Sequence, residues 1–259
     1  MPLELNFREY GDGDAVILLL HGLFGSSANW GSVARQLAAR YKVLVPDLRN
    51  HGQSPHAADV SYAAMAGDLL ALLDHHNLDR ALFVGHSMGG KVAMRLALHA
   101  PHRVLGLAVV DMAPVAYTHR FDQVFEAFAS VDLSGLQSRA DADAPMARVL
   151  PDPGVRTFLQ QNLFRDAKGW HWRCSLEALR EGQGRSTAFD VDAGARYTGP
   201  ASFIYGTASD YLLPQHEPQV QRFFPAARLC AVQGAGHWVY AEQPTAFMDC
   251  LQQFLRAAR

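Results

Sequence analysis

The sequence predicts an α/β protein in which a mostly parallel sheet is flanked by helices. Short apolar runs rich in β-branched residues alternate with helical patterns along most of the chain. The alternation stops between Ala113 and about Pro200, which indicates an insertion between two strands. A serine flanked by glycines, Ser87, stands where one apolar run meets a helical pattern. The expected parallel strands cover residues 16–20, 42–45, 81–84, 105–110, 201–205 and 228–232.

Local patterns predict the elements outside the insertion. Residues 3–10 precede the turn Gly11-Asp12-Gly13-Asp14 and are expected to form an edge strand. Residues 61–76 are expected to form an amphipathic helix with Ser61 as its N-cap. Another helix is expected over residues 91–99. The helices expected at 214–224 and 244–258 each carry proline early, where its missing N–H costs nothing.

The insertion is expected to be helical. It contains no convincing strand, and helices are expected at 122–130, 144–150, 154–164 and 173–182. A segment of this length between two strands is best interpreted as a lid over the strand ends, where open α/β sheets bind ligands. The predicted organisation is therefore a core domain of residues 1–112 and 201–259, with a helical lid inserted at 113–200.

The expected lid is rich in aromatic residues. At helical spacing such residues more often form the core of a lid than line a substrate site, but some must face the nucleophile, which predicts an apolar acyl pocket. Acidic residues balance the basic ones between Thr118 and Pro200, so no basic stripe stands out for the phosphates of a coenzyme A thioester. The aromatic residues are Tyr117, Phe121, Phe125, Phe128, Phe158, Phe164, Trp170 and Trp172.

Composition excludes several classes of function. The chain has 259 residues, 49% of them hydrophobic, and a formal net charge of -2, so it shows no bias toward nucleic acid or anionic membranes. No signal-peptide pattern opens the chain, and the longest aliphatic run, residues 15–20, is too short to span a bilayer. Cys174, Cys230 and Cys250 form no C-x-x-C pair and are expected to be buried free thiols in a reducing cytoplasm. The oligomeric state is not indicated.

The motif Gly85-His86-Ser87-Met88-Gly89 follows an apolar run and precedes a helical pattern. In a turn this sharp only hydrogen fits at the flanking positions, so Gly85 and Gly89 let the strand and the helix pass close together. The serine is pushed above the carboxyl end of the sheet. The helix that starts beside it directs N–H groups toward any oxyanion formed there. This context predicts an activated serine nucleophile, Ser87.

An activated serine needs a base, and the base needs an orienting acid. Among the twelve histidines, His237 follows the last predicted strand, where a loop would bring its imidazole to the serine. His86 lies inside the sharp turn and is expected to be structural. The adjacent histidines at 75–76 cannot share a helix face, and no H-E-x-x-H spacing occurs, so no metal site is predicted.

A second turn is expected to complete an oxyanion hole. The segment His21-Gly22-Leu23-Phe24-Gly25 follows the strand at 16–20. The backbone N–H of Leu23 would act together with the N–H of Met88, the residue after the nucleophile.

Two aspartates compete for the role of the acid. Asp111 ends the strand at 105–110, and Asp210 follows the strand at 201–205. We favour Asp111, with Ser209 making a hydrogen bond beside His237, and keep Asp210 as the alternative. A serine alone cannot hold the charge of an imidazolium, so one carboxylate must lie near.

These pieces together resemble an α/β-hydrolase along the whole chain, and in particular the small bacterial esterase and acyl-CoA thioesterase family that has mitochondrial abhydrolase relatives. The resemblance implies the α/β-hydrolase fold, carboxylic-ester hydrolysis without a cofactor, a catalytic Ser87 and His237, and an acid at Asp111 assisted by Ser209. Many α/β-hydrolases carry the acid where this chain has Ser209. The matching segments are His21-Gly22-Leu23-Phe24-Gly25-Ser26, Asp47-Leu48-Arg49-Asn50-His51-Gly52-Gln53-Ser54-Pro55, Gly85-His86-Ser87-Met88-Gly89-Gly90-Lys91, Val110-Asp111-Met112-Ala113-Pro114 and Gly234-Ala235-Gly236-His237-Trp238.

The expected function is a serine carboxylesterase that cleaves small or short-to-medium acyl esters, or acyl-CoA thioesters, through an acyl-enzyme. No cofactor, metal or nucleic-acid partner is expected. The alternatives are carbon–carbon bond hydrolysis or cofactor-free perhydrolysis on the same residues, and a small-molecule receptor with slow turnover. Dehalogenases and epoxide hydrolases are disfavoured because they carry aspartate where Ser87 stands.

Overall fold

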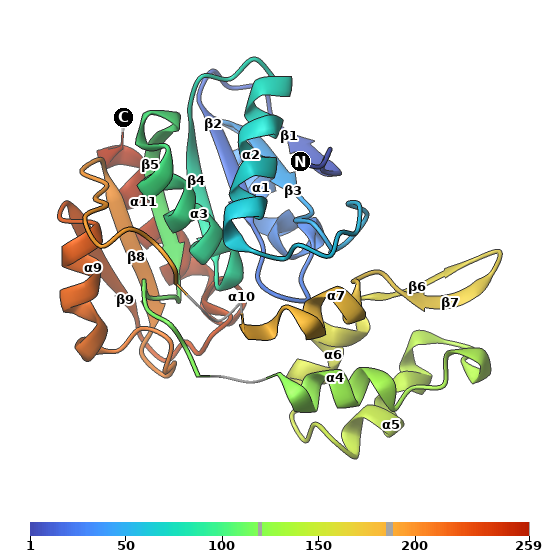
Figure 1. Ribbon diagram of the computed structural model, residues 1–259. Helices are drawn as coiled ribbons and strands as arrows, with labels where there is room; N and C mark the ends of the chain where they lie inside the picture. Colours follow the sequence, from blue (N-terminus) through green and yellow to red (C-terminus); the bar gives the residue numbers. More distant parts are fainter. Residues whose placement is uncertain (119–120, 185–188, 259) are drawn as a thin grey trace.

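The seven-stranded main sheet confirms the predicted α/β-hydrolase fold class. The computed structural model describes residues 1–118, 121–184 and 189–258 (Figure 1). The strand order is β1-β3-β2-β4-β5-β8-β9, and only the edge strand β1 runs antiparallel to its neighbour. The strands are β1 (Phe7–Tyr10), β2 (Val16–Leu20), β3 (Lys42–Pro46), β4 (Ala81–His86), β5 (Val104–Val110), β8 (Ala201–Gly206) and β9 (Ala227–Val232).

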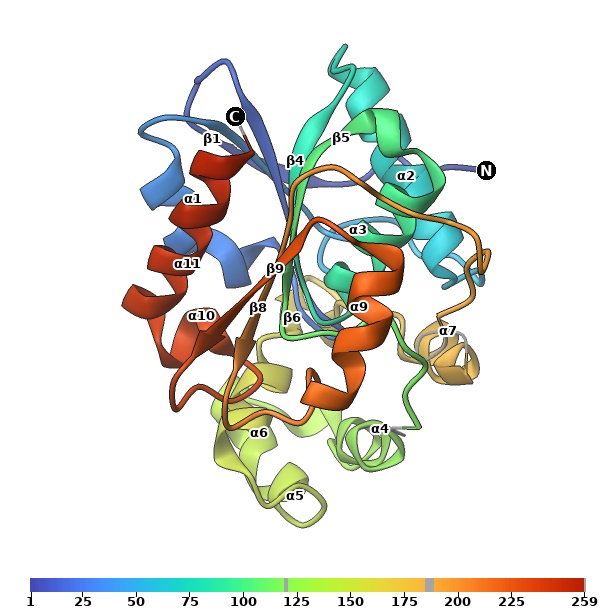
Figure 2. The same cartoon turned by 90° about the vertical axis from the view of Figure 1, so that its left-hand side faces the viewer.

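Helices cover both faces of this sheet. Figure 2 shows α1 and α11 on one face and α2, α3 and α9 on the other. In the described ranges every helix is too short or too polar to cross a bilayer. The core helices are α1 (Gly31–Leu37), α2 (Tyr62–His75), α3 (Met88–His99), α9 (Glu217–Phe223), α10 (Val239–Glu242) and α11 (Pro244–Ala257).

The two helical layers each bury an apolar core against the sheet. Leu69 and Met94 lie in the core beneath α2 and α3, and Trp30 and Phe247 lie in the core on the α1 and α11 side. As predicted, Ser61 caps α2, since its Oγ accepts a hydrogen bond from Ala64 N at 3.2 Å. The helix expected at 214–224 is divided into a 3-10 turn, Pro214–His216, and α9.

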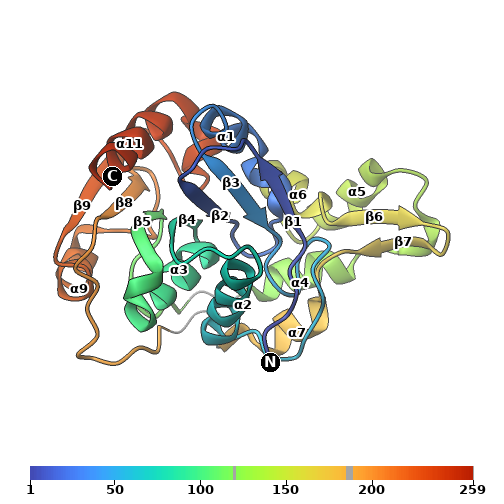
Figure 3. The same ribbon diagram turned by 90° about the horizontal axis from the view of Figure 1, so that it is seen from above.

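The helices and the hairpin within residues 113–200, called the insertion below, lie beyond the carboxyl ends of the strands (Figures 1 and 3). Its last described residues, 189–200, run back along the sheet, where Tyr197 Oη donates to Val104 O at the start of β5. The expectation that the insertion contains no strand is wrong, because β6 and β7 form an antiparallel hairpin. The helix expected at 154–164 therefore ends early, and its last residues belong to β6. The elements are α4 (Asp122–Ala129), α5 (Asp143–Ala147), α6 (Pro153–Gln160), β6 (Leu163–Asp166), β7 (Gly169–Trp172) and α7 (Leu176–Glu181).

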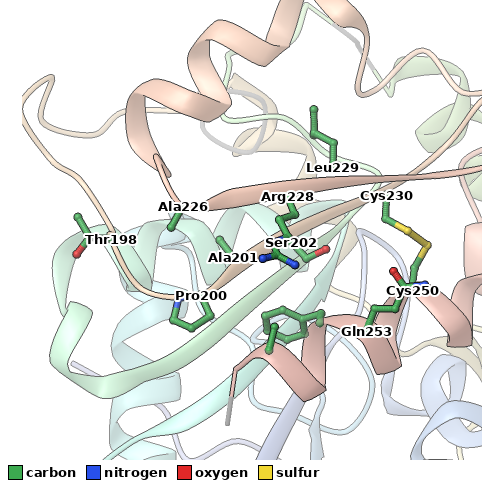
Figure 4. Close-up of a pocket in the computed structure, with 12 residues that line it drawn as sticks. Thr198, Pro200, Ala201, Ser202, Ala226, Arg228, Leu229, Cys230, Cys250 and Gln253 are labelled. Carbon is green, nitrogen blue, oxygen red and sulfur yellow. A yellow bond between two sulfur atoms is a disulfide. The ribbon is translucent and has the colours of Figure 1, made fainter.

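Two of the three cysteines are paired, which corrects the expectation of three free thiols. Cys230 on β9 and Cys250 on α11 form a disulfide with their Cα atoms 6.1 Å apart (Figure 4). Packing of α11 against the edge of the sheet brings the two residues together. Cys174 is free and buried, and burial raises the pKa of its thiol to about 12. The argument for a reducing compartment rested on three free cysteines and therefore fails. The cytoplasmic location stays a prediction.

Candidate active site

Ser87 stands at the end of β4 in a strained backbone conformation. Its φ of 53° lies in the left-handed region that favours glycine, and its ψ is -118°. A Cβ on Gly85 would lie 2.3 Å from Gly89 O, and a Cβ on Gly89 would lie 2.5 Å from Leu20 O. Only glycine therefore allows the close passage of β4 and α3 at Gly85 that the motif predicts, and Gly89 allows α3 to approach the end of β2. Ser87 Oγ makes no hydrogen bond within the described part of the chain.

The structure brings Asp111 and His237 into direct contact. The register of β4 and β5 pairs His86 with Val110, so Ser87 and Asp111 leave adjacent strands at the same level. His237 Nδ1 lies 2.7 Å from Asp111 Oδ2, and the Asp111 side chain is fully buried while 18% of the His237 side chain is exposed.

The residues in the turn after β8 have different surroundings. Ser209 Oγ donates a hydrogen bond to Asp111 Oδ2 at 2.5 Å, so its partner is the carboxylate and not the imidazole. Gly206 N donates to Asp111 Oδ1 at 3.1 Å. Asp210 is exposed and makes no hydrogen bond with His237. Of the two aspartates that the sequence offered, the one in contact with His237 is Asp111.

Three contacts hold the loop that carries His237. The backbone N–H groups of Gly236 and Trp238 donate to the Glu242 carboxylate at 2.6 and 3.1 Å. His86 Nε2 lies 2.8 Å from His237 O, and because a carbonyl only accepts, His86 donates. Burial, followed by the proximity of His237, lowers the pKa of His86 well below its usual value. His86 is thus a neutral structural residue, as expected.

One aromatic residue that the sequence did not single out, Tyr211, covers the imidazole. The ring of Tyr211 stacks on His237, with ring centroids 3.9 Å apart and an interplanar angle of 20°. Tyr117 Oη donates to Tyr211 O and accepts from Ala113 N. Burial raises the pKa of Tyr211 to about 12, so this phenol is neutral at physiological pH. Nothing in the local sequence indicates that the ring of Tyr211 meets His237, or that Tyr117 in the insertion holds Tyr211.

Lys91 lies one helical turn beyond Ser87 and is buried, with 1% exposed. Its Nζ donates to Val115 O and lies 4.7 Å from the centroid of the Tyr117 ring and 4.9 Å from that of Phe189. Burial lowers the pKa of Lys91 to about 7. The Lys91 amine thus holds the start of the insertion, and Tyr117 in this segment contacts Tyr211.

The turn after β2 packs directly against the nucleophile. A Cβ on Gly22 would lie 3.2 Å from Ser87 Cβ. The turn is held by His21, whose Nε2 accepts from Leu48 N at 2.9 Å while Nδ1 donates to Gly22 O at 2.8 Å. Met88 is the first residue of α3, so its N–H has no acceptor within the helix. Leu23 therefore follows the glycine that lies against Ser87, and Met88 directly follows Ser87.

A cavity of about 130 Å³ contains three of the candidate residues: Ser87, His237 and Leu23. Ser87, His237, Leu23 and Tyr211 line it, and most of the other walls are apolar. Phe121 and Phe158 are the members of the aromatic set in the insertion that reach it. Phe125 and Phe128 instead pack against Phe24, at centroid distances of 5.4 and 5.3 Å. The prediction that some of the insertion aromatics line an apolar pocket agrees with this lining.

The segment Arg49-Asn50-His51-Gly52 is structural. Arg49 forms a buried ion pair with Asp68 at 2.7 Å, with side-chain exposures of 3% and 0%. Burial, with a smaller effect of His21, lowers the pKa of His51 to about 3, so His51 is neutral. No cluster of three or more metal-ligating side chains occurs among residues 1–118, 121–184 and 189–258.

Comparisons with known proteins agree with this geometry. The α/β hydrolase fold family matches residues 15–244. The chain is 39% identical to the mouse sn-1-specific diacylglycerol lipase ABHD11, over 98% of this chain and 86% of that protein. It is 38% identical to the esterase YbfF of Escherichia coli strain K12, over 98% of this chain and 99% of that protein.

A solved structure of a marine microorganism esterase has a TM-score of 0.94 at 34% identity and covers 97% of this chain and 99% of its own. The structural similarity to this esterase therefore extends over the insertion as well as the sheet. The chain belongs to the α/β-hydrolase family, among its ester-hydrolysing enzymes.

Proposed function

We propose that the protein is a serine carboxylesterase that cleaves small or short-to-medium acyl esters through an acyl-enzyme. The observation that carries the proposal is the hydrogen bond of 2.7 Å between His237 Nδ1 and buried Asp111, in a cavity that Ser87 also lines. A base oriented by a carboxylate, in the same cavity as a serine hydroxyl, is the arrangement that activates a serine.

In the proposed reaction Ser87 Oγ attacks the ester carbonyl and passes its proton to His237 Nε2. The N–H groups of Leu23 and Met88 stabilise the oxyanion. The carbon–oxygen bond to the alcohol then breaks, and the alcohol takes the proton from His237. Water, deprotonated by the same imidazole, releases the acid and restores the serine. Asp111 stabilises the imidazolium, and Ser209 orients Asp111 through its hydrogen bond.

The proposed roles extend to the insertion and to the choice of substrate. Residues 113–200 act as a lid, because Phe121, Val124 and Phe158 roof the cavity that holds Ser87. No lysine or arginine lines this cavity within the described residues, which favours neutral esters over coenzyme A thioesters. The names of the relatives add acylglycerols to the candidate substrates.

The test is a panel of p-nitrophenyl esters of increasing acyl length, with diacylglycerol and an acyl-CoA series beside it. We expect turnover of the neutral esters by the wild type and none by Ser87→Ala. A product burst followed by very slow turnover would indicate the receptor alternative. Equal activity of Ser87→Ala would contradict the proposal.

A further inference from the structure

Two cavities meet beside Ser87. The inner one, about 130 Å³, contains Ser87 and His237. The outer one, about 850 Å³, is a groove between α6 and α10. Figure 2 shows these two helices as neighbours. Both cavities are lined by Asn29, Phe158, Trp238 and Tyr240, so these four residues form the boundary between them.

The boundary is closed by two contacts from the insertion to the core. The ring of Phe158 on α6 packs on that of Trp238, with centroids 5.6 Å apart. Nearby, Asn29 Nδ2 donates to Gln161 Oε1 at 3.3 Å. Both contacts connect the end of α6 with core residues, Asn29 and Trp238, that line the inner cavity.

The position of Phe158 is fixed by its own helix. Asn162 is buried, and its Nδ2 donates to Phe24 O at 2.8 Å, which ties the end of α6 to the turn beside Ser87. Leu159, adjacent to Phe158, is 1% exposed and packs in the core. Phe158 is therefore held in place across the boundary and is not a freely moving surface side chain.

The two cavities differ in chemistry. Apart from the reactive residues the inner one is lined mainly by aromatic and aliphatic side chains, including Phe121 and Val124. A protein cavity of about 150 Å³ holds one benzene molecule, which has six carbon atoms. The inner cavity is of similar size, so it has room for an acyl chain of roughly six carbons. The outer groove is more polar and is lined by Asp152, Thr157 and Glu242.

The proposed reaction gives each cavity a part of the ester. The leaving alcohol must take its proton from His237, and four of the five residues that follow His237 line the outer groove: Trp238, Tyr240, Ala241 and Glu242. The alcohol therefore fits the outer groove, where hydrophilic groups find polar partners. The acyl chain fits the inner apolar cavity.

Resting on the proposed esterase function, we propose that Phe158, packed on Trp238, is the wall that divides the acyl site from the alcohol site and limits acyl length. Removing the Phe158 ring joins the two cavities, and a longer acyl chain then extends past the boundary. A larger side chain at this position shortens the accepted chain.

The test measures kcat/KM on p-nitrophenyl esters from acetate to decanoate for the wild type, Phe158→Ala and Phe158→Trp. Each extra methylene group that finds a place in an apolar cavity is worth roughly fourfold in kcat/KM. We therefore expect the octanoate-to-butyrate ratio to rise about 15-fold or more in Phe158→Ala and to fall in Phe158→Trp. Phe164→Ala is the matched control, because Phe164 packs on His171 and lines neither cavity.

A second series, butyrate esters of alcohols from ethanol to octanol, tests which part of the ester lies where. Its profile is expected to change far less in Phe158→Ala than the acyl profile does. A change in the alcohol profile alone overturns the assignment, as does an unaltered acyl profile in both Phe158 variants. Absence of hydrolysis and of phosphonate labelling in the wild type would instead contradict the esterase function itself. Because Phe158→Trp removes no contact area, it decides the matter even if Phe158→Ala fails to fold.

Discussion

Replacement of Asp111 by asparagine should be the most damaging change after loss of the serine. One oxygen of Asp111 accepts from His237 and Ser209, and the other accepts from Gly206 N. Asparagine offers one acceptor and one donor group. If the amide oxygen faces His237, the NH₂ group faces the N–H of Gly206, and two donors oppose each other there. If the NH₂ group faces His237 instead, it opposes the N–H at Nδ1. The first arrangement strains the strand end and the second forces the wrong tautomer.

The expected size of the effect follows from the role of the acid. Loss of the carboxylate as asparagine leaves the imidazolium without its counter-charge and costs roughly 10⁴ in kcat. Ser209→Ala removes one hydrogen bond to the charged Asp111 carboxylate, worth about 1.5–3 kcal/mol, or roughly 10- to 150-fold in rate. Asp210→Asn changes an exposed carboxylate with no hydrogen bond to His237 and should stay within about threefold of the wild type.

The assay is kcat on a single p-nitrophenyl ester for the three variants, with circular dichroism and thermal melting as controls for folding. The order of severity should be Asp111→Asn, then Ser209→Ala, then Asp210→Asn. A nearly normal Asp111→Asn beside an inactive Asp210→Asn would falsify the assignment and move the acid to the turn after β8.

Three further predictions concern stability and cofactors. The pKa of Lys91 is lowered to about 7 in the fold, so between about pH 7 and 10 the unfolded chain binds more protons and the free energy of unfolding rises with pH. Lys91→Met lacks this dependence. In urea titrations its free energy of unfolding, relative to that of the wild type, should therefore fall by roughly 2–3 kcal/mol between pH 6 and pH 9. A difference between the two proteins that does not change with pH would show that Lys91 stays charged. Reduction of the Cys230–Cys250 disulfide, which spans 20 residues, should lower the free energy of unfolding by about 3 kcal/mol, and identical urea midpoints with and without dithiothreitol would refute this. EDTA should leave ester hydrolysis unchanged, and loss that a divalent cation restores would reveal a metal requirement.

Local sequence patterns predicted the parts of the site that depend on local backbone geometry. The glycines around Ser87 are required by the close approach of α3 to β4 and to the end of β2, so a short motif was enough to indicate the turn. The positions of Asp111 and His237 follow from strand ends, which apolar runs reveal. The choice between Asp111 and Asp210 was harder, because it depends on which side chain turns toward the imidazole.

Features that depend on tertiary packing were missed. The stacking of Tyr211 on His237 joins two loops, and the spacing within either loop does not indicate it. The Cys230–Cys250 disulfide depends on the packing of a helix against an edge strand. The β6–β7 hairpin was not predicted, because each of its strands is only four residues long, too short for a periodic pattern to stand out.

Covalent labelling with an organophosphonate tests the central role of Ser87 most directly. Intact-mass analysis of the wild type should show one added phosphonyl group, peptide mapping should assign it to Ser87, and labelling should abolish ester hydrolysis. Ser87→Ala should remain unlabelled and lose on the order of 10⁶ in kcat. An unlabelled but active wild type, or a label on Ser87→Ala, would show that another residue is the nucleophile.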